Sequence, residues 1–313
     1  MALLFLATTA FAQKSINKTF SGVEDIRLNV PSGNILIKKG SGSEVKITVD
    51  FTYDEDDYTP EFKQTGTRLR LSEDFRDKRS WNYRGRSEWT LEVPDGLSLD
   101  MNTGSGNIEV MNLEADVDLN SGSGNIDLED LKGYARATSG SGNINASEIE
   151  GSLKANTGSG EVRVEDINGD SDLNSGSGNI RGENATGGMK YNTGSGNIRA
   201  MNAAITDHSR FNTGSGNVEV ILSAELSSDV SLNSGSGNAT LNFNGQTIEG
   251  KFTLESSNKN SFSAPFEFDK EYEEDSGNGR RRGYTRYIKE ASIGSKDIHI
   301  DIATGTGSVR VKK

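Results

Sequence analysis

The feature that most constrains this chain is a glycine-rich motif that recurs at a nearly fixed spacing. Its first copy in the regular region, residues 103–110, reads Thr-Gly-Ser-Gly-Asn-Ile-Glu-Val. Successive copies begin 18 residues apart five times and then 20 and 21 residues apart, with first glycines at Gly104, Gly122, Gly140, Gly158, Gly176, Gly194, Gly214 and Gly235. A period this short and regular is typical of a solenoid, in which each repeat forms one coil of a stack.

The residues between the glycines alternate between apolar and polar, and no helical period interrupts them. In the first period the apolar positions are Ile108, Val110, Leu113, Val117 and Leu119. Alternation bounded by glycine and serine predicts two short half-buried strands in each coil. A small residue 11 positions after the first glycine should make one turn, and the motif should make the other. In-register stacking would align equivalent residues in columns about 4.8 Å apart.

Two segments lack this regularity and carry most of the aromatic residues. We expect them to be irregular excursions that cap the ends of the stack, because a coil cannot bury its own apolar face without a neighbour. The motif returns near the C-terminus, at Thr304 to Val311, so the second excursion should not be a separate domain. The predicted organisation is one domain, 13–313, with regular coils at 20–50 and 88–244, excursions at 51–87 and 245–297, and a last coil at 298–311.

The first residues predict export. Residues 1–12 form an apolar run that ends in Ala10-Phe11-Ala12, the small-x-small pattern of a secretory cleavage site, so we expect cleavage before Gln13. A buried N-terminal strand is the alternative. The chain has no cysteine, which excludes disulfides, thiolate metal sites and a lipid anchor on cysteine. No later apolar run reaches the ~20 residues that span a bilayer. The expected location is the periplasm, the outer surface or the medium.

The charge and the few candidate catalytic residues argue against several function classes. A net charge of -12 disfavours nucleic acid as a partner. Asp207-His208-Ser209 contains the residue types of a catalytic triad, but side chains of adjacent residues point apart, so we expect a solvated loop there. His299 lies between two isoleucines and should face outward. We therefore expect no enzyme activity.

The Gly-Ser-Gly-Asn motif could suggest a phosphate loop or a calcium-binding turn. The motif leads into a strand rather than a helix N-terminus, which disfavours phosphate. Ile108 and its equivalents stand where calcium-binding β-rolls carry aspartate. We expect no cofactor and no metal, and interpret the asparagines as a hydrogen-bonded column along the turn.

One outward column carries three arginines. Five positions after the first glycine, the coils present Glu109, Asp127, Asn145, Arg163, Arg181, Arg199 and Glu219. Stacked arginines repel one another unless they are paired. Arg163 and Arg181 could form a ladder of ion pairs with Glu165 and Glu183. Alternatively, Arg163, Arg181 and Arg199 could form a strip that binds an anionic glycan or an acidic protein.

A second candidate site lies in the first excursion, where Trp81, Tyr83 and Arg84 belong to a basic, aromatic segment. These side chains could stack on a glycan, or they could cap the solenoid. Trp89 continues an alternating strand and should be part of the core.

At these residues a family resemblance appears. Leu91-Glu92-Val93-Pro94, then Leu97 to Met101, then serial Thr/Ser-Gly-Ser-Gly-Asn-Ile coils resemble the exported β-strand-repeat "putative adhesins" of bacteria, a family of unknown function related to the head GIN adhesin domains. The resemblance covers most of residues 20–245 and the last coil. It implies an all-β fold, a single-stranded right-handed β-helix or β-solenoid with 18-residue coils, and an adhesive role.

The resulting functional expectation is a non-enzymatic β-solenoid of the cell envelope, an adhesin or scaffold that binds an extracellular glycan or an envelope protein. Two alternatives stay open. One is a polysaccharide lyase or glycosidase, since right-handed β-helices host such enzymes. The other is an envelope sensor or assembly component. An exposed end of the stack could also lead to a homo-oligomer.

Overall fold

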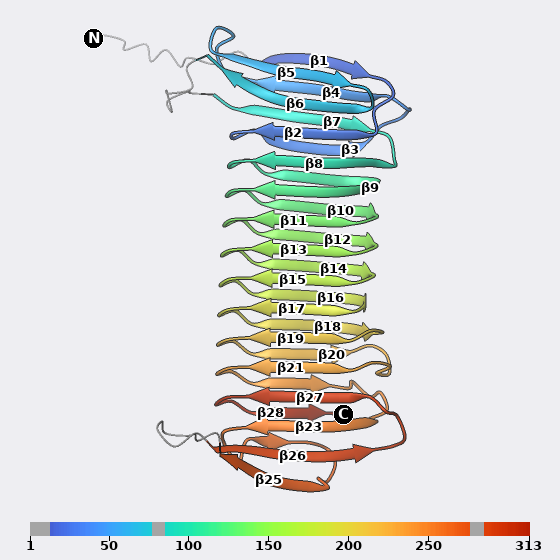
Figure 1. Cartoon of the computed structure of the whole chain (residues 1–313), viewed down its shortest axis with the longest axis vertical. Coiled ribbons are helices and arrows are strands. Elements are labelled where there is room, and N and C mark those ends of the chain that lie inside the picture. The colour runs from blue at the N-terminus through green and yellow to red at the C-terminus, as the bar shows by residue number, and fades with distance from the viewer. Residues whose placement is uncertain (1–12, 77–84, 276–284) are drawn as a thin grey trace, which may run out of the picture.

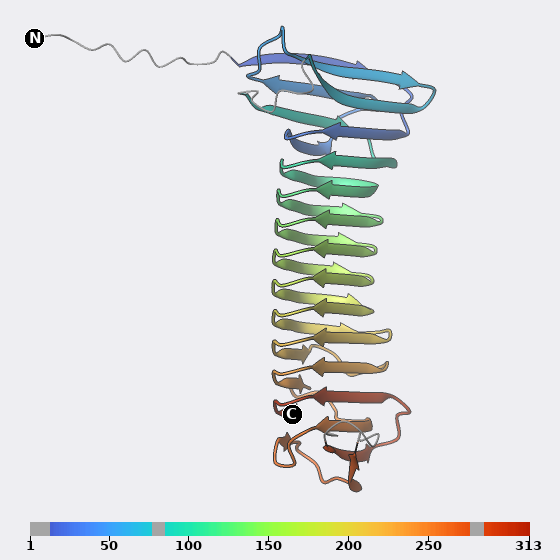
Figure 2. The ribbon, with the colours of Figure 1, turned by 60° about the vertical axis from the view of Figure 1, so that its left-hand side comes forward.

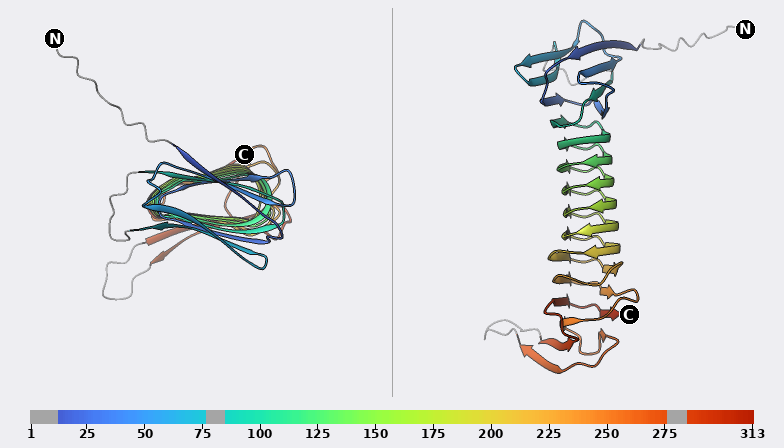
Figure 3. Two further views of the ribbon diagram at one scale, coloured as in Figure 1. Left: turned by 90° about the horizontal axis from the view of Figure 1, so that it is seen from above. Right: turned by 90° about the vertical axis from the view of Figure 1, so that its right-hand side faces the viewer.

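The computed structural model describes residues 13–76, 85–275 and 285–313, and these contain strands, turns and no helix. The strands stack along one long axis into a narrow column (Figure 1). The chain winds around this axis in flattened coils that superimpose when the molecule is seen from above (Figure 3). The predicted all-β solenoid is confirmed. The expected signal peptide, residues 1–12, lies outside the described residues.

Two sheets form the long walls of the column. We name them sheet A and sheet B, and β9 (Ile108–Ser121) passes through both. Sheet A holds β1 (Lys14–Phe20), β3 (Asn34–Lys39), β4 (Val45–Phe51), β7 (Ser87–Val93), β10 (Ile126–Lys132), β12 (Ile144–Glu150), β14 (Val162–Asn168), β16 (Ile180–Gly187), β18 (Ile198–Ile205), β20 (Val218–Leu222), β22 (Ala239–Asn242), β24 (Phe262–Ser263) and β28 (Val309–Lys312).

Sheet B holds β2 (Asp25–Val30), β5 (Tyr58–Thr65), β6 (Arg68–Phe75), β8 (Leu97–Thr103), β11 (Ala135–Ser139), β13 (Leu153–Thr157), β15 (Ser171–Ser175), β17 (Met189–Thr193), β19 (Ser209–Thr213), β21 (Val230–Ser234), β23 (Gly250–Ser256), β25 (Lys270–Asp275), β26 (Thr285–Ile293) and β27 (His299–Thr304).

In the regular region each coil contributes one strand to each sheet, and the strands of neighbouring coils are parallel (Figure 2). Residues 18 apart pair directly, as in Ile126 with Ile144 in sheet A and Ala135 with Leu153 in sheet B. The inward residues of both sheets are almost completely buried and form the core between them. Alternation in the sequence therefore specifies both the strands and the face that each one buries.

Large and small residues compensate for one another inside the column. Tyr191 and Phe211 lie in successive coils with their rings edge to face, 5.2 Å apart between centroids. Gly182 stands opposite, and a Cβ on it would lie 2.8 Å from the Tyr191 hydroxyl oxygen. The missing side chain gives the tyrosine ring its space.

The glycine motif forms the corner where one coil stacks most tightly on the next. A Cβ on Gly142 would lie 2.0 Å from the carbonyl oxygen of Gly124 in the preceding coil. The buried Thr157 hydroxyl donates to the Gly142 carbonyl (2.8 Å) and accepts from the Gly160 N–H (3.1 Å). Glycine is needed here because two backbones approach where no side chain fits.

The opposite corner needs unusual backbone angles. Asn112, Asp130, Glu148, Asp166, Asn184 and Asn202 have φ between 49° and 55°. Gly133, Gly151, Gly169 and Gly187, at the expected small position, have φ between 130° and 141°. Residues with a Cβ rarely adopt the φ angles of these four glycines, which explains the glycine at this turn in four successive coils.

The N-terminal cap is not built in chain order. The first coil, β2 and β3, lies inside the stack, because β2 pairs with both β6 and β8, and β3 pairs with both β7 and β9. Beyond it, β4 and β1 extend sheet A with antiparallel pairing, and β5 extends sheet B in the same way. Residues 51–87 were expected to be an irregular excursion that caps the stack; they do cap it, and they contain β5 and β6, which continue sheet B.

The C-terminal end repeats this arrangement. The coil formed by β27 and β28 lies between the β21–β22 coil and the β23–β24 coil. The antiparallel strands β26 and β25 then close sheet B. Residues 245–297 were also expected to be irregular, and they supply one more coil and a strand pair. The expectation that the returning motif would find a neighbour in the stack is confirmed.

Candidate functional site

The predicted arginine column exists on the outer face of sheet A. Arg163, Arg181 and Arg199 are register partners in successive coils. Each is about half exposed and has one carboxylate partner: Glu161 for Arg163 (3.1 Å), Glu183 for Arg181 (3.8 Å) and Glu219 for Arg199 (3.1 Å). Glu165 was the expected partner of Arg163, and this prediction was wrong. Ion pairs of this exposure contribute little stability, and they neutralise the column.

The pairing of Arg163 also accounts for a break in the asparagine column at the glycine corner. The Asn143 Oδ1 accepts the backbone N–H of Glu161, as Asn125 Oδ1 accepts that of Asn143. The predicted hydrogen-bonded column is therefore confirmed. Glu161 replaces asparagine inside the column, and its carboxylate contacts the Arg163 guanidinium instead of continuing the ladder.

The second predicted site, Trp81, Tyr83 and Arg84, lies outside the described residues. Other aromatic residues of the first excursion that the structure describes pack against one another in the cap. Trp89 is fully buried, as expected, and its Nε1–H and the Tyr58 hydroxyl both donate to Glu73 Oε1 at 2.9 Å. Burial, followed by the charge of Glu73, raises the pKa of Tyr58. These rings serve the cap rather than a ligand surface.

The two histidines do not form catalytic arrangements. His208 is exposed in a turn, whereas Ser209 is buried on β19, where its hydroxyl donates to the Asp207 carbonyl and accepts from the Met189 N–H. His299 faces outward, 3.7 Å from an Asp229 carboxylate oxygen. Among the described residues, no group of three histidine or carboxylate side chains could hold a metal ion.

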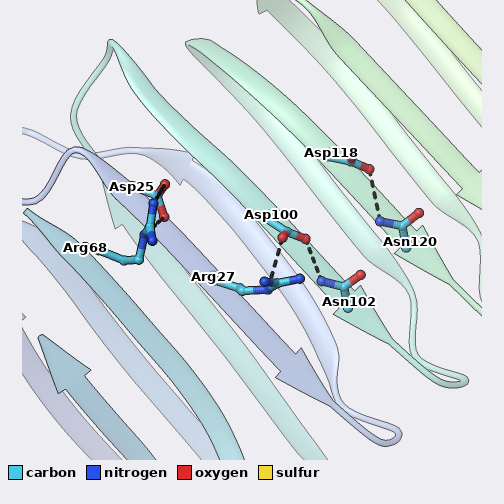
Figure 4. A network of polar contacts seen from close by, with 7 residues as sticks. All are labelled: Asp25, Arg27, Arg68, Asp100, Asn102, Asp118 and Asn120. Atoms are coloured by element: carbon cyan, nitrogen blue, oxygen red, sulfur yellow. Dashed lines mark hydrogen bonds and ion pairs between the residues drawn. The ribbon is translucent and has the colours of Figure 1, made fainter. Parts of the chain in front are cut away.

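Sheet B carries a second charged column that the sequence analysis did not single out. Its N-terminal end holds two arginine–aspartate ion pairs (Figure 4). Arg68 forms two hydrogen bonds to the Asp25 carboxylate (3.2 and 3.3 Å), and Arg27 lies 3.1 Å from Asp100. These pairs neutralise Arg68 and Arg27, whereas Arg70, the register partner of Arg27, is exposed and forms no ion pair among the described residues.

The middle of the same column differs. Arg136, Lys154, Asp172, Lys190 and Arg210 follow one another in register across five coils. Lys154 lies 3.2 Å from Asp172. Within the part of the chain that the structure describes, Arg136, Lys190 and Arg210 are exposed and form no ion pair. We call Arg136, Lys154, Lys190 and Arg210 the basic strip. The exposed charges of Arg136, Lys190 and Arg210 take no part in the packing of the fold.

A ladder of asparagine amides runs beside the basic strip, two residues further along each strand. The Nδ2 of Asn174, Asn192, Asn212 and Asn233 each donates to the Oδ1 of the asparagine one coil earlier, at 2.9–3.1 Å. The asparagine that precedes most copies of the glycine motif is the sequence signal for this ladder, which the prediction treated only as part of a turn.

One aromatic side chain is exposed beside the basic strip. Among the described residues the exposed large apolar or aromatic side chains are Tyr134 (44%) and Tyr272 (39%). The Tyr272 hydroxyl donates to Glu290, whereas the Tyr134 hydroxyl has no hydrogen-bond partner among the described residues. Tyr134 stands between two shallow hollows on sheet B. One is lined by Arg27, Arg70, Asp116 and Asp118, and the other by Lys154, Lys190, Asp170 and His208.

The carboxylates of the second hollow already have partners. Asp172 pairs with Lys154, Asp170 accepts the Gly188 N–H at 2.9 Å, and Asp207 accepts the His208 N–H at 2.6 Å. The Asp172 and Asp170 contacts join successive coils, and the Asp207 contact lies within one turn. Lys190, His208 and Tyr134 line the same hollow, and their side chains have no polar partner among the described residues.

The edge strand of sheet B, β25, has features that oppose self-association of the chain. Every residue of β25 is exposed, and five of its six residues are charged: Lys270, Glu271, Glu273, Glu274 and Asp275. Charged side chains on an edge strand oppose pairing with a second chain. A homo-oligomer remains a prediction.

The fold and its surface define a class: an all-β solenoid with charged residues ordered in outward columns. The chain belongs to the Toastrack DUF4097 family, whose model matches residues 23–265. This confirms the predicted membership in an adhesin-like family of unknown function. No curated protein is similar enough to match the chain. In the described residues, no helix has the length and apolar character needed to cross a bilayer.

Several solved structures are similar to the chain at low sequence identity. A "putative lipid binding protein" from Parabacteroides distasonis is 17% identical, with 96% of this chain and 97% of that one covered and a TM-score of 0.47. A "putative adhesin" from Bacteroides fragilis is 12% identical, with 96% and 98% covered and a TM-score of 0.39. A "putative cell adhesion protein" from Clostridium sporogenes is 14% identical, with 96% and 99% covered and a TM-score of 0.25.

Proposed function

We propose that this chain is an exported, non-enzymatic binding module of the cell envelope, an adhesin or scaffold that attaches to a glycan or an envelope protein through its outer faces. The observation that carries the proposal is the set of exposed cations on sheet B that have no ion-pair partner among the described residues. Export follows from the apolar run at residues 1–12. The expected location is the periplasm, the outer surface or the medium.

The arrangement supports binding more than catalysis. Glycosidases place two carboxyl groups on either side of the scissile bond. In the hollow beside Tyr134, Asp170 and Asp172 already hold a backbone N–H and a lysine. A flat wall of parallel strands with ordered columns instead offers many weak contacts to a long ligand, which suits attachment through multiple sites.

The test is a glycan array and a set of envelope proteins probed with the purified chain, run beside a depolymerisation assay on every glycan that binds. We expect saturable binding to at least one glycan or envelope protein without release of reducing ends or unsaturated products. Bond cleavage would establish a lyase or glycosidase instead. Absence of binding to every glycan and protein would refute an adhesive role.

A further inference from the structure

We propose, building on the function above, that the basic strip of sheet B binds the acid groups of an anionic polysaccharide that runs along the solenoid axis, with Tyr134 stacking on one of its sugar rings. The site comprises Arg136, Lys154, Lys190, Arg210, Tyr134 and the neighbouring asparagine ladder. It lies on the face opposite the arginine column that the sequence suggested.

The first argument is the local charge. The chain carries a net charge of -12, yet the strip places four cations and one carboxylate in five consecutive coils. On sheet A, each stacked arginine has a glutamate partner. On sheet B, Lys154 has a carboxylate partner, Asp172, at 3.2 Å, and the other three cations of the strip have none among the described residues. Unpaired neighbouring cations repel one another, and an anionic ligand would remove this cost.

The second argument is the spacing. Register partners in adjacent coils lie about 4.8 Å apart along the axis. Lys190 and Arg210 are one coil apart, as are Arg136 and Lys154. An extended pyranose unit has a length comparable to this spacing, so successive acid groups of a linear polysaccharide can meet successive cations. Each contact is exposed and weak, and affinity arises from their number.

The third argument is the chemistry beside the cations. Asn192 and Asn212 each use one N–H and the amide oxygen along the column, which leaves a second N–H available for a sugar hydroxyl, whereas Asn174 and Asn233 donate their second N–H to Asp172 and Ser231. Tyr134 offers an exposed ring and a hydroxyl without a partner among the described residues. A tyrosine with an apolar face and a polar tip suits a sugar, which has both C–H faces and hydroxyl edges.

The face fits a polysaccharide better than a peptide or a nucleic acid. Strands β11, β13, β15, β17 and β19 pair on both sides, so they offer no free edge to which a peptide strand could add. The negative charge of the whole chain opposes the long-range approach of a nucleic acid. A short row of cations on a flat wall instead matches a thin linear polyanion.

The experiment is isothermal titration of the full chain with polygalacturonate, with its methyl ester as the neutral counterpart, with dextran sulfate and with poly-glutamate. We expect binding to polygalacturonate that weakens at high salt, and little binding to the ester. The affinity for dextran sulfate, compared with that for polygalacturonate, shows whether the strip prefers sulfate or carboxylate groups. Tighter binding of poly-glutamate than of either polysaccharide would overturn the proposal in favour of an acidic protein.

Matched variants locate the site. Lys190→Gln with Arg210→Gln should weaken polygalacturonate binding about tenfold, and Tyr134→Ala should weaken it independently. Arg163→Gln with Arg181→Gln removes the same charge from sheet A and should change affinity less than about twofold. Circular dichroism verifies that each variant is folded. Equal losses on both faces, or equal affinity for the neutral ester, would refute the strip while leaving the proposed function intact. Failure to bind any glycan or envelope protein would refute both.

Discussion

Substituting one corner glycine should destabilise the whole stack, because the glycine motif is a contact between backbones. The Cβ of Gly142→Ala would lie 2.0 Å from the Gly124 carbonyl oxygen and 2.5 Å from its carbon, whereas real Cβ contacts essentially never fall below 3.0 Å. The corner cannot move freely, because the Gly142 N–H donates to the Ser139 hydroxyl, and that hydroxyl donates to the Gly124 carbonyl, each at 2.9 Å.

The expected cost combines overpacking, typically 1–3 kcal/mol, with one or two lost hydrogen bonds of about 1 kcal/mol each. We predict a loss of roughly 2 to 5 kcal/mol in the free energy of unfolding. Urea denaturation followed by circular dichroism measures it. The control is Gly42→Ala, since nothing lies within 4 Å of that Cβ and its φ is ordinary for other residues. A loss for Gly142→Ala no larger than for Gly42→Ala would show that the motif does not serve stacking.

Three further predictions concern the core, the surface and the order of the coils. Burial raises the pKa of Tyr191 to about 12 from 10.0, so the unfolded chain loses this proton first. Stability should therefore fall by about 2 to 3 kcal/mol between pH 10 and 12, and Tyr191→Phe should remove that part of the pH dependence in urea titrations. Arg181→Ala should cost less than about 1 kcal/mol, and a larger loss would contradict the exposed pairing. Thr240→Cys with Arg310→Cys should form a disulfide, seen as a mobility shift without reductant, because these residues are register partners; failure to oxidise would contradict the inserted last coil.

Most of the regular body could be predicted from the sequence because each residue contacts the equivalent residues of the two neighbouring coils. When every coil has nearly the same length, the residue 18 positions away is the neighbour, so the column from Glu109 to Glu219 follows from counting. Counting back four residues from the next motif glycine, Gly194 or Gly214, would likewise have placed Lys190 beside Arg210 on sheet B, although the two are 20 positions apart. The sequence pattern favoured sheet A because Arg163, Arg181 and Arg199 occupy three successive coils, whereas Asp172 interrupts the cations of sheet B.

The caps and the choice of ion pairs could not be predicted in this way. The first coil lies between β6–β7 and β8–β9, and the chain supplies these neighbours from segments without a repeat. Arg163 has glutamates two residues before and two residues after it on the same face, and alternation does not distinguish Glu161 from Glu165. In the structure the Arg163 guanidinium pairs with Glu161. The exposure of Tyr134 likewise depends on how its turn projects from the wall.

The most direct measurement of where this solenoid binds its ligand is a crystal structure of the chain with an oligogalacturonate. We predict an extended sugar chain on sheet B, parallel to the axis, with its carboxylates at Lys190 and Arg210 and one ring against Tyr134. Sugar density along Arg163, Arg181 and Arg199 on sheet A, or in the glycine corner, would contradict the assignment of function to the basic strip.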